Sequence, residues 1–569
     1  MGQYRPGMLY GGLVLLTVLW FFLGIETPVY LQADAAADDF LMVRYAETLL
    51  RGEWLGAFDS MTLVKTAGYP ALLAAGAVLH VPYVVGLRLA YFLAVVAACL
   101  ALRSFLDYRW CAFLYVFLLF SPAMICEETV QRVYRGGYIV SFSLLVLACV
   151  VGMFIASCRS WRETLAWSIL CSAALPIFWF LKEDSIWILP LVLIAALLAA
   201  VRLWQRARRH RILCVLIPFL PLCMLFAIQQ VYELQNLQHY GEKIVVDRSG
   251  TQFSRLITDL FRLDQTNAAP SVWLTHQALS QAMEVSPTLA EMRTPVERIY
   301  GQELPAYVPD SRLRDPYLHG EIPGDFAIWK LRDAASETGI YARGGAAAEA
   351  WYARAAEEIE SALRQGELRK GTGRLYLSSI CRGYSREEMQ AYVFSRTGDV
   401  LINMATYRYA GLIARPATGT EQEIARMERL VKSPALSASP SEEELQRAER
   451  HIRYWSWIVT LYQWCGLPLA IAGMAGSALL LWNIMMKRKA SSRVLREQAV
   501  VLLGLGGSIA GLVVGVQWFA SFLPERSIYY YLYAAYPMMQ ICECLGLVVL
   551  SRRISAEWYG EKRILGRNI

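Results

Sequence analysis

Runs of about twenty apolar residues recur along this chain, and they constrain its fold more than any other feature. A helix of roughly this length crosses a hydrocarbon core about 30 Å thick, and only a helix or a closed barrel satisfies its backbone there. Of the 569 residues, 56% are hydrophobic and 18% are charged. The sequence therefore predicts an all-α polytopic membrane protein. We expect about ten spans, at residues 8–24, 83–105, 110–125, 137–157, 164–181, 185–201, 212–231, 456–485, 498–522 and 528–550.

Basic residues mark alternate connections between these spans. If the N-terminus is cytoplasmic, the inner connections carry Arg103, Arg109, Arg159, Arg162, the segments RLWQRARRHR and KRKASSRVLR, and a basic C-terminal tail. The short outer connections carry few basic residues, which is the asymmetry that the positive-inside rule describes. The net charge of +7 is thus explained by membrane orientation. No nucleic-acid-binding signature accompanies it, so we expect a lipid bilayer and no nucleic acid as partner.

The spans divide the chain into three parts. Residues 1–231 form an N-terminal transmembrane module with a long first outer loop, 26–82. Residues 232–455 form a large extracytoplasmic domain, in which stretches such as AAAEAWYARAAEEIESALRQGEL have the spacing of amphipathic helices and end at Gly366. Residues 456–569 form a C-terminal transmembrane module and a cytoplasmic tail.

The first outer loop contains an acidic pair, Asp38 and Asp39, before an expected amphipathic helix that stops at Gly52. Two interpretations are open. Carboxylates stabilise the positive end of a helix dipole, which alone can explain the pair. Alternatively, with Asp34 they form an acidic cluster at the outer membrane face, where a lipid-linked phosphate presents its head group.

The second outer turn, SPAMICEETVQRVYRGGY, holds more charge than solubility requires. Arg132 and Arg135 are suited to phosphate oxygens because the guanidinium is a planar fork of donors. Glu127 or Glu128 can complete a site for Mg²⁺ or Mn²⁺ together with Asp38, since these ions prefer oxygen ligands. An interfacial salt bridge is the simpler alternative.

Two further outer turns carry candidate cations. The turn FWFLKEDSIWILP contains Lys182, which can contact a phosphate, although its acidic neighbours can equally cap the next helix. The turn FLPERSIYYYLYAAYP contains Arg526 beside tyrosines of the kind that anchor helices at a membrane interface. The nucleotide-binding motif GxxxxGK[ST] and the nucleophile motif GxSxG are both absent, which argues against an ATP-driven pump and a serine hydrolase.

Several of these segments resemble the GT-C class of membrane glycosyltransferases, which includes protein O-mannosyltransferases and the aminoarabinose transferase of lipid A. The resemblance rests on the acidic pair after the first span, on RYAETLLRGEW, and on AGYPALLAAG before the second span. The segments SPAMICEETVQRVYR, KEDSIWILP, AMEVSPTLAEM and IWKLRDAASETGIY resemble a poorly characterised bacterial branch of the class.

The resemblance implies an inverting enzyme of the bacterial cytoplasmic membrane. It would transfer a sugar from a polyprenyl-phosphate donor to an envelope glycan, lipid or protein acceptor on the outer face, with or without a divalent metal. Asp38 matches the catalytic aspartate of the class, and Asp39 stands where the class has Glu, so either can be the base. Lys65, Arg132, Arg135, Lys182 and Arg526 are the implied contacts to substrate and phosphate.

Two other functions compete with this hypothesis. A transporter or flippase of lipid-linked saccharides would need charged or broken helices near the bilayer midplane and internal repeats, and no repeat is visible. A non-catalytic envelope assembly protein would use the large outer domain as a binding platform and would not need the acidic first loop.

Overall fold

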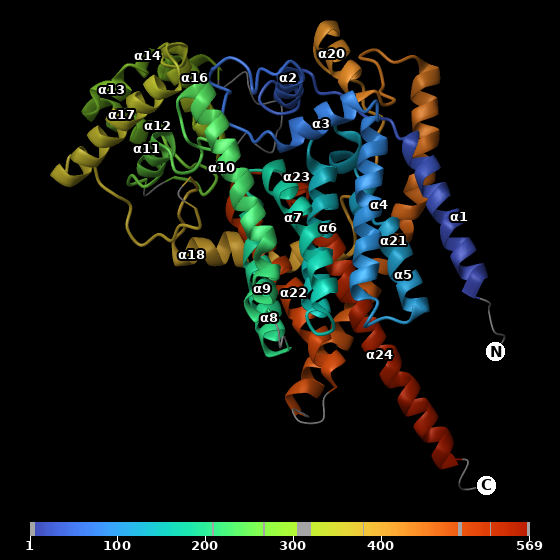
Figure 1. Cartoon of the computed structure of the whole chain (residues 1–569). Coiled ribbons are helices and arrows are strands. Elements are labelled where there is room, and N and C mark those ends of the chain that lie inside the picture. The colour runs from blue at the N-terminus through green and yellow to red at the C-terminus, as the bar shows by residue number, and fades with distance from the viewer. Residues whose placement is uncertain are drawn as a thin grey trace.

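The computed structural model describes residues 6–565, apart from 207–209, 266–267, 304–319, 379, 487–491 and 524. Within these residues, eight helices or joined helices are long and apolar enough to cross a membrane. They are seen in Figure 1 as α1 (Pro6–Ile25), α4 (Tyr83–Leu102), α6 (Gly136–Ala156), α7 (Trp161–Leu181), α8 (Leu189–Arg206), α9 with α10 (Arg211–Leu216 and Leu220–Tyr240), α21 (Glu442–Met486) and α22 (Arg493–Phe519).

The two remaining predicted spans are also helical, but they are not simple spans. Residues 110–125 form α5 (Tyr108–Leu119), which has only 12 residues, followed by a 3-10 turn. Residues 528–550 fall on α23 (Glu525–Leu532) and α24 (Ala535–Leu565), whose axes meet at 67°. If that bent pair is one span, the described residues contain nine spans. The prediction of an all-α polytopic membrane protein is confirmed.

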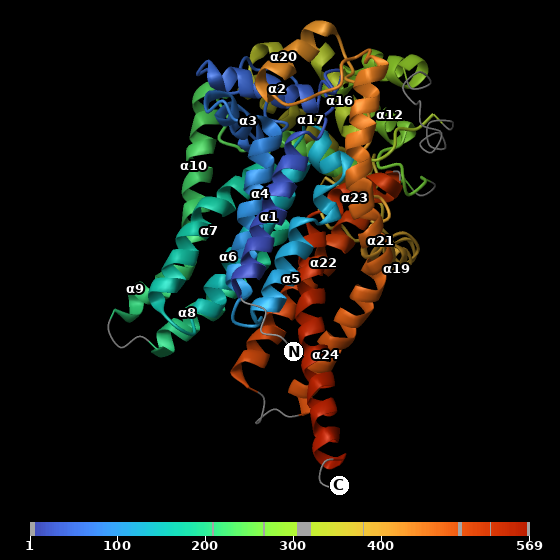
Figure 2. The same cartoon turned by 90° about the vertical axis from the view of Figure 1, so that its right-hand side faces the viewer.

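Two of these helices are longer than their predicted spans and continue into the region between residues 232 and 455. α10 runs on to Tyr240, past the predicted limit at residue 231, and α21 begins at Glu442 instead of residue 456. At 1.5 Å per residue, the 45 residues of α21 measure about 65 Å, roughly twice the hydrocarbon thickness. Figure 2 shows α21 descending along the side of the bundle from the level of α20 (Glu421–Val431).

The outer region between these two spans is helical and has a core of its own. Its helices are α11 (Gln252–Phe261), α12 (His276–Val285), α13 (Pro287–Ala290), α14 (Arg293–Arg298), α16 (Phe326–Glu337) and α17 (Gly345–Gln365), followed by α18 (Arg386–Glu388) and α19 (Thr397–Ala405). Trp273, Trp351 and Ile359 are buried in this core. As predicted, α17 ends where Gly366 adopts a left-handed conformation. Among the described residues, β-pairing is limited to isolated bridges, and no strand of several residues is formed.

Four of those bridges tie together distant segments at one end of the bundle. The start of the first outer loop pairs through Val29 with Ala435, through Tyr30 with Arg132 and through Gln32 with Thr418, and Cys126 pairs with Gly411. The same loop contributes α2 (Asp39–Leu50) and α3 (Gly68–Val78), which lie next to this end in Figure 1. Gly68 is needed at the start of α3, because a Cβ there would lie 2.1 Å from the carbonyl oxygen of Phe180.

The charges buried within the described spans include an arginine on α4. Arg88 on α4 is fully buried, and its guanidinium carbon lies 4.8 Å from the ring of Trp20 on α1 and 4.9 Å from the ring of Trp455 on α21. Nη1 also donates to the carbonyl oxygen of Met124 at 3.3 Å. Two aromatic faces and one carbonyl therefore take the place of a carboxylate partner.

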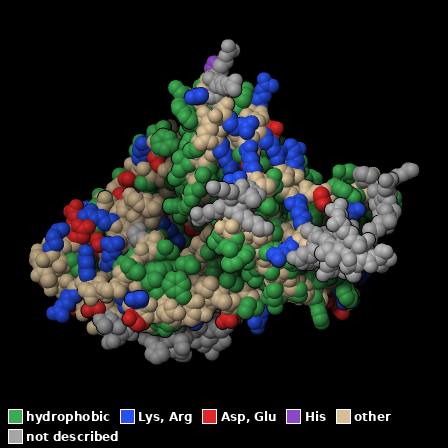
Figure 3. All heavy atoms as spheres, turned by 90° about the horizontal axis from the view of Figure 1, so that it is seen from below, with side chains coloured by type: hydrophobic (Ala, Val, Ile, Leu, Met, Phe, Trp, Pro, Cys, Tyr) green, Lys and Arg blue, Asp and Glu red, His purple; other side chains and the backbone are tan. Residues whose placement is uncertain are grey.

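The opposite end of the bundle is basic. Seen from below in Figure 3, Lys and Arg side chains gather around the protruding end of the molecule. Exposed arginines there come from the connection between α4 and α5 (Arg103, Arg109) and from that between α6 and α7 (Arg159, Arg162). Part of the predicted basic segments, residues 207–209 and 487–491, lies outside the described residues.

Candidate active site

Asp38 and Asp39 lie at the start of α2, and their side chains have different partners. Asp38 precedes the helix, yet its carboxylate makes no capping hydrogen bond. It accepts hydrogen bonds from Lys65 Nζ at 2.8 Å and from the Tyr134 hydroxyl at 2.9 Å. The Asp38 side chain remains 44% exposed. Capping therefore does not account for Asp38, whose carboxylate is held by side chains from two other segments.

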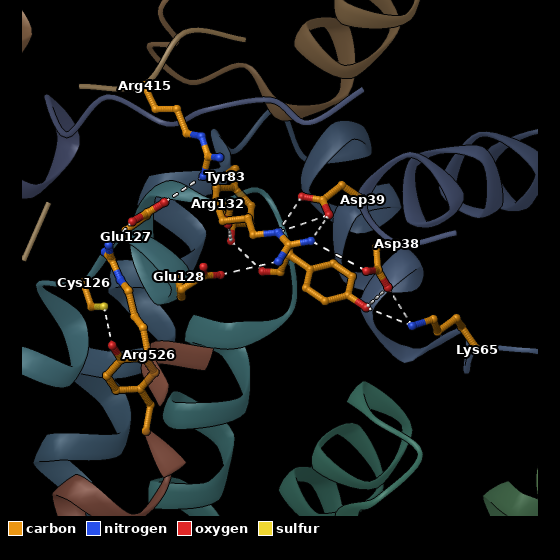
Figure 4. Close-up of polar contacts among 12 residues, drawn as sticks. Asp38, Asp39, Lys65, Tyr83, Cys126, Glu127, Glu128, Arg132, Arg415 and Arg526 are labelled. Atoms are coloured by element: carbon orange, nitrogen blue, oxygen red, sulfur yellow. Dashed lines mark hydrogen bonds and ion pairs between the residues drawn. The ribbon is translucent and has the colours of Figure 1, made fainter. Parts of the chain in front are cut away.

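Asp39 is completely buried against Arg132. Its carboxylate accepts hydrogen bonds from Arg132 Nε at 3.0 Å and from Arg132 Nη2 at 2.5 Å. Figure 4 shows that Arg132 reaches across between the acidic pair and Glu128, whose carboxylate lies 3.4 Å from Arg132 Nη1. A forked contact of this kind fixes both partners in orientation.

Two glycines allow the turn that carries Arg132 to pack closely against the start of α6. Residues Glu127–Gln131 form a π-helical turn that folds back on the start of α6. A Cβ at Gly136 would lie 2.5 Å from the carbonyl oxygen of Glu128, and one at Gly137 would lie 2.2 Å from that of Thr129. The glycine pair in the segment VYRGGY thus lets the charged turn pack directly onto a span.

Tyr134 connects the cations of the site to Asp38. The guanidinium carbons of Arg132 and Arg135 lie 4.7 Å and 4.9 Å from the centre of its ring, within the range of a cation–π contact. Its hydroxyl donates to Asp38 and accepts from Lys65 Nζ at 3.2 Å. The ring therefore spaces the two arginines, and the hydroxyl orients the accessible carboxylate.

The two aspartates differ in their ionisation. Burial raises the pKa of Asp38, but Lys65 and then Arg132 outweigh it and hold that pKa below its usual value. Burial also raises the pKa of Asp39, and this effect exceeds the opposing one of Arg132, so that the pKa is about 6. Of the two carboxylates, only Asp38 is accessible to a ligand.

Arg135 is paired with an acid from another turn. Its Nη1 donates to both carboxylate oxygens of Glu183 at 2.8 Å, and Glu183 also accepts from the backbone N–H of Thr66 at 3.1 Å. Both side chains are nearly buried. Glu183 therefore joins the first outer loop, the second turn and the third turn.

This pairing predicts a pH-dependent contribution to stability. Burial raises the pKa of Glu183, but Arg135 and Lys65 lower it to about 2, from an ordinary value of 4.5. Because the folded pKa is the lower one, the ionised carboxylate stabilises the fold above pH 4.5, and this contribution is lost as the pH falls towards 2. We expect the apparent Tm in detergent to fall less steeply between about pH 5 and 3 in Glu183→Gln than in the wild type.

The matched control for this experiment is Asp184→Asn in the same turn, because Asp184 is 61% exposed. That variant should keep the wild-type slope of Tm against pH. Equal slopes for Glu183→Gln and the wild type would contradict the pairing.

Lys182 lies at the edge of the same site. Its Nζ is 2.6 Å from Asp184 Oδ2 and 4.2 Å from the centre of the Tyr531 ring. The lysine side chain is 12% exposed. Lys182 thus contacts both the third turn, through Asp184, and α23, through Tyr531.

The outer domain contributes three residues that sequence reasoning missed. Trp329 on α16 lies over Lys65, with Nζ 5.5 Å from its ring centre, and Arg248 packs on the same ring at 4.6 Å. Arg248 Nη1 is 3.8 Å from Asp325, whereas Nε and Nη2 are buried without a hydrogen-bond partner in the described chain. Trp329 lies in IWKLRDAASETGIY, a segment noted only for its family resemblance.

Glu127 belongs to a different cluster from Asp38. It binds Arg415 at 2.9 Å and Arg526 at 2.6 Å, on the far side of Arg132 from Asp38 and Lys65 in Figure 4. Among the described residues no group of three or more His, Cys, Asp or Glu side chains could hold a metal ion. The described structure does not bring Asp38, Glu127 and Glu128 together, because Arg132 lies between these carboxylates and pairs with Asp39 and Glu128. A divalent metal stays a prediction.

The predicted site residues thus fall into two neighbouring groups. Asp38, Asp39, Lys65, Arg132 and Arg135 surround Tyr134 or its immediate partners, and Lys182 lies at the edge of this group against Asp184 and Tyr531. Arg526 binds Glu127 in the other group. An ionised, accessible carboxylate bordered by cations can accept a proton from a bound hydroxyl next to an anionic group.

Fold and site together define the class: a polytopic membrane protein with a cluster of charged side chains at the end of its helix bundle opposite the basic connections. No protein-family model matches the chain, and no curated protein matches it. Among solved structures it is similar to ArnT from Cupriavidus metallidurans. The apo structure is 15% identical, with a TM-score of 0.32 over 79% of this chain and 89% of that one. The structure bound to undecaprenyl phosphate is 14% identical, with a TM-score of 0.29 over 95% of this chain and 78% of that one.

Proposed function

We propose that this protein is an inverting GT-C-type glycosyltransferase that uses a polyprenyl-phosphate sugar as donor. The observation that carries the proposal is Asp38, a half-exposed carboxylate at one end of the helix bundle that Lys65 and Arg132 keep ionised and that accepts a hydrogen bond from Tyr134. The motifs around this residue resemble the GT-C class in sequence. An envelope glycan, lipid or protein would be the acceptor.

Asp38 is the proposed base, and Asp39 positions Arg132. An acceptor hydroxyl loses its proton to Asp38 while its oxygen attacks the anomeric carbon of the sugar. The bond from that carbon to the phosphate oxygen breaks, and the polyprenyl phosphate leaves with the electron pair. One displacement inverts the configuration at the anomeric carbon. Asp39 has no exposed surface and both its oxygens engage Arg132, which leaves it unsuited to touch substrate.

Lys65 links donor binding to the strength of the base. With Lys65 at 2.8 Å, Asp38 holds a proton weakly, which limits a general base at neutral pH. A donor phosphate attracts the same ammonium group. As Lys65 shifts towards the phosphate, the proton affinity of Asp38 rises, so the base becomes effective when the donor is in place.

Arg248 and Lys65 are the proposed contacts to the donor phosphate. Arg248 has two buried nitrogens without a hydrogen-bond partner among the described residues, and it shares the Trp329 ring with Lys65. Two cations at the phosphate oxygens stabilise the charge of the leaving group. Arg132 and Arg135 are already held by Asp39 and Glu183, so their effect on the phosphate is electrostatic.

The sidedness follows from the charge distribution. The exposed arginines of the short connections lie at the opposite end of the bundle from Asp38. By the positive-inside rule, that basic end faces the cytoplasm and the site faces the extracytoplasmic side.

Substitution of Arg248 tests the donor site. Arg248→Ala should raise the Kd for undecaprenyl phosphate by about 10- to 100-fold, because hydrogen bonds to charged groups contribute about 1.5–3 kcal/mol. Arg248→Lys should recover part of the loss, since it restores the charge without the fork. The Kd is measured by titration of the purified protein in detergent.

Arg255→Ala is the control, because Arg255 belongs to the same domain and is paired with Glu360. It should bind the carrier like the wild type. Wild-type affinity in folded Arg248→Ala would remove Arg248 from the donor site.

A further inference from the structure

A small cavity lies among the ends of three spans at the basic end of the helix bundle, which Figure 3 shows from below. Its volume is about 140 Å³, and it is lined by the last turn of α4, the last turns of α6 and the first turns of α7. Of these helices, α6 packs against both of the others. The proposed active site lies at the opposite end of the bundle, so the two sites are separate.

The inner part of the cavity is apolar and is formed by small side chains. Gly152 and Ala156 lie one turn apart on α6, and Ala101 lines the same cavity from α4. Trp167 on α7 forms one wall, and its ring packs so tightly on α6 that a Cβ at Gly152 would lie 2.4 Å from it. Leu100 also lines the cavity and is 50% exposed. Because an exposed leucine within a span faces the bilayer, the cavity opens towards lipid.

Three charged residues complete the lining of the cavity. Arg103 follows the end of α4 and Arg159 follows α6, and both are exposed. Neither arginine side chain makes a hydrogen bond or an ion pair with the described residues. Glu163 lies in the first turn of α7, where the helix dipole stabilises a carboxylate. Two positive charges thus stand against one negative charge, and both guanidinium groups are free to donate to an anion.

The other arginine in each of the same two connections is already engaged. Arg109 Nε donates to the hydroxyl of Tyr108 at 3.0 Å, and the Arg162 guanidinium carbon lies 5.5 Å from the ring centre of Trp161. Both arginines lie outside the described lining of the cavity. Tyr108 and Trp161 are 46% and 47% exposed, and such aromatic residues at the ends of spans are typical of the membrane interface. The charged side of the cavity therefore lies at the level of the lipid head groups.

We propose that this cavity binds an anionic phospholipid of the inner leaflet, with its phosphodiester between Arg103 and Arg159. Guanidinium forks match phosphate oxygens, and a basic pocket between spans on the cytoplasmic side fits a phospholipid head group. Glu163 accepts from a hydroxyl of the head group. Phosphatidylglycerol, which has one negative charge and two hydroxyls, therefore meets all three charged residues. The leaflet follows from the sidedness inferred above, and the site does not depend on the glycosyltransferase function.

The test is a titration of the purified full-length protein with dihexanoyl phosphatidylglycerol, in an uncharged detergent at physiological ionic strength. The double variant Arg103→Ala/Arg159→Ala should raise the Kd by about tenfold or more, because both contacts to the phosphate are lost. Arg109→Ala/Arg162→Ala is the matched control. It removes the same charge from the same two connections but leaves the cavity intact, so its Kd should stay near that of the wild type.

Four outcomes would overturn the proposal. An unchanged Kd in folded Arg103→Ala/Arg159→Ala would remove the lipid from the cavity, and an equal rise in both double variants would show that only the diffuse charge of the basic end attracts it. Inorganic phosphate that binds as tightly as the lipid would assign the cavity to a soluble anion. Equally tight binding of dihexanoyl phosphatidylcholine would show that the head-group charge is not recognised.

A second variant covers the case in which the alanine variants fold poorly. Arg103→Lys/Arg159→Lys keeps both charges but loses the planar forks, so it should raise the Kd by a smaller factor than the alanine pair. A wild-type Kd in the lysine variant would contradict the contact between the guanidinium forks and the phosphate.

Discussion

Replacement of Asp38 by asparagine is expected to slow sugar transfer by about 10²–10⁴-fold, the typical contribution of a general base. The amide keeps the shape of the side chain and can still accept from Lys65 and Tyr134, so the fold should be unchanged. The measurement is the release of undecaprenyl phosphate from a polyprenyl-phosphate sugar, in membranes that contain the native acceptors.

Asp34→Asn is the matched control, because Asp34 belongs to the same acidic cluster but is exposed and bonded to Thr418 at 2.5 Å. It should transfer at the wild-type rate. Full activity in Asp38→Asn would place the base elsewhere, and full activity in Asp38→Asn/Asp39→Asn would favour a transporter of lipid-linked saccharides.

Loss of the buried pair between Asp39 and Arg132 is expected to have the largest effect on stability. Arg132→Met leaves Asp39 as a buried carboxylate without its forked partner, and breaking a buried ion pair costs about 3–5 kcal/mol. We expect a large fall in the apparent Tm and in the yield of monodisperse protein in detergent. The double variant Asp39→Asn/Arg132→Met should regain part of that loss, since no buried charge is then unpaired.

Arg44→Met serves as the comparison, because its ion pair with Asp59 is one-third to two-fifths exposed. Exposed pairs contribute about 0–1 kcal/mol, so its Tm should stay near that of the wild type. Equal Tm values for Arg132→Met and Arg44→Met would show that the stability of the fold does not depend on the ion pair between Asp39 and Arg132.

The sequence predicted the membrane helices well because lipid imposes one rule on all of them. Every predicted span is helical, since a long apolar run in lipid has no other way to satisfy its backbone. The exceptions arise from tertiary contacts. The 12 residues of α5 and the bend between α23 and α24 depend on neighbouring helices and not on local hydropathy.

The candidate site was predictable in its charged turns but not in its pairing. Asp38 lies in the first outer loop and Arg132 in the short second turn, and the charges clustered in these segments already indicated a function. Which acid binds which base depends on how the turns fold back, as at Gly136 and Gly137, and no spacing in the sequence shows this. Arg248 and Trp329 were missed because they lie far along the chain in a domain of ordinary composition, and only the packing of α16 brings them to Lys65.

The position of Arg88 bears on how the protein is assembled during synthesis. A ribosome delivers α1 and α4 early, so Trp20 can cover one face of the guanidinium at once. Trp455, which covers the other face, is made 367 residues after Arg88 (455 − 88). Until α21 arrives, the N-terminal module carries an arginine that lacks one of its two aromatic neighbours. The last third of the chain thus completes the first, because a truncated N-terminal module leaves one face of the Arg88 guanidinium without its aromatic neighbour.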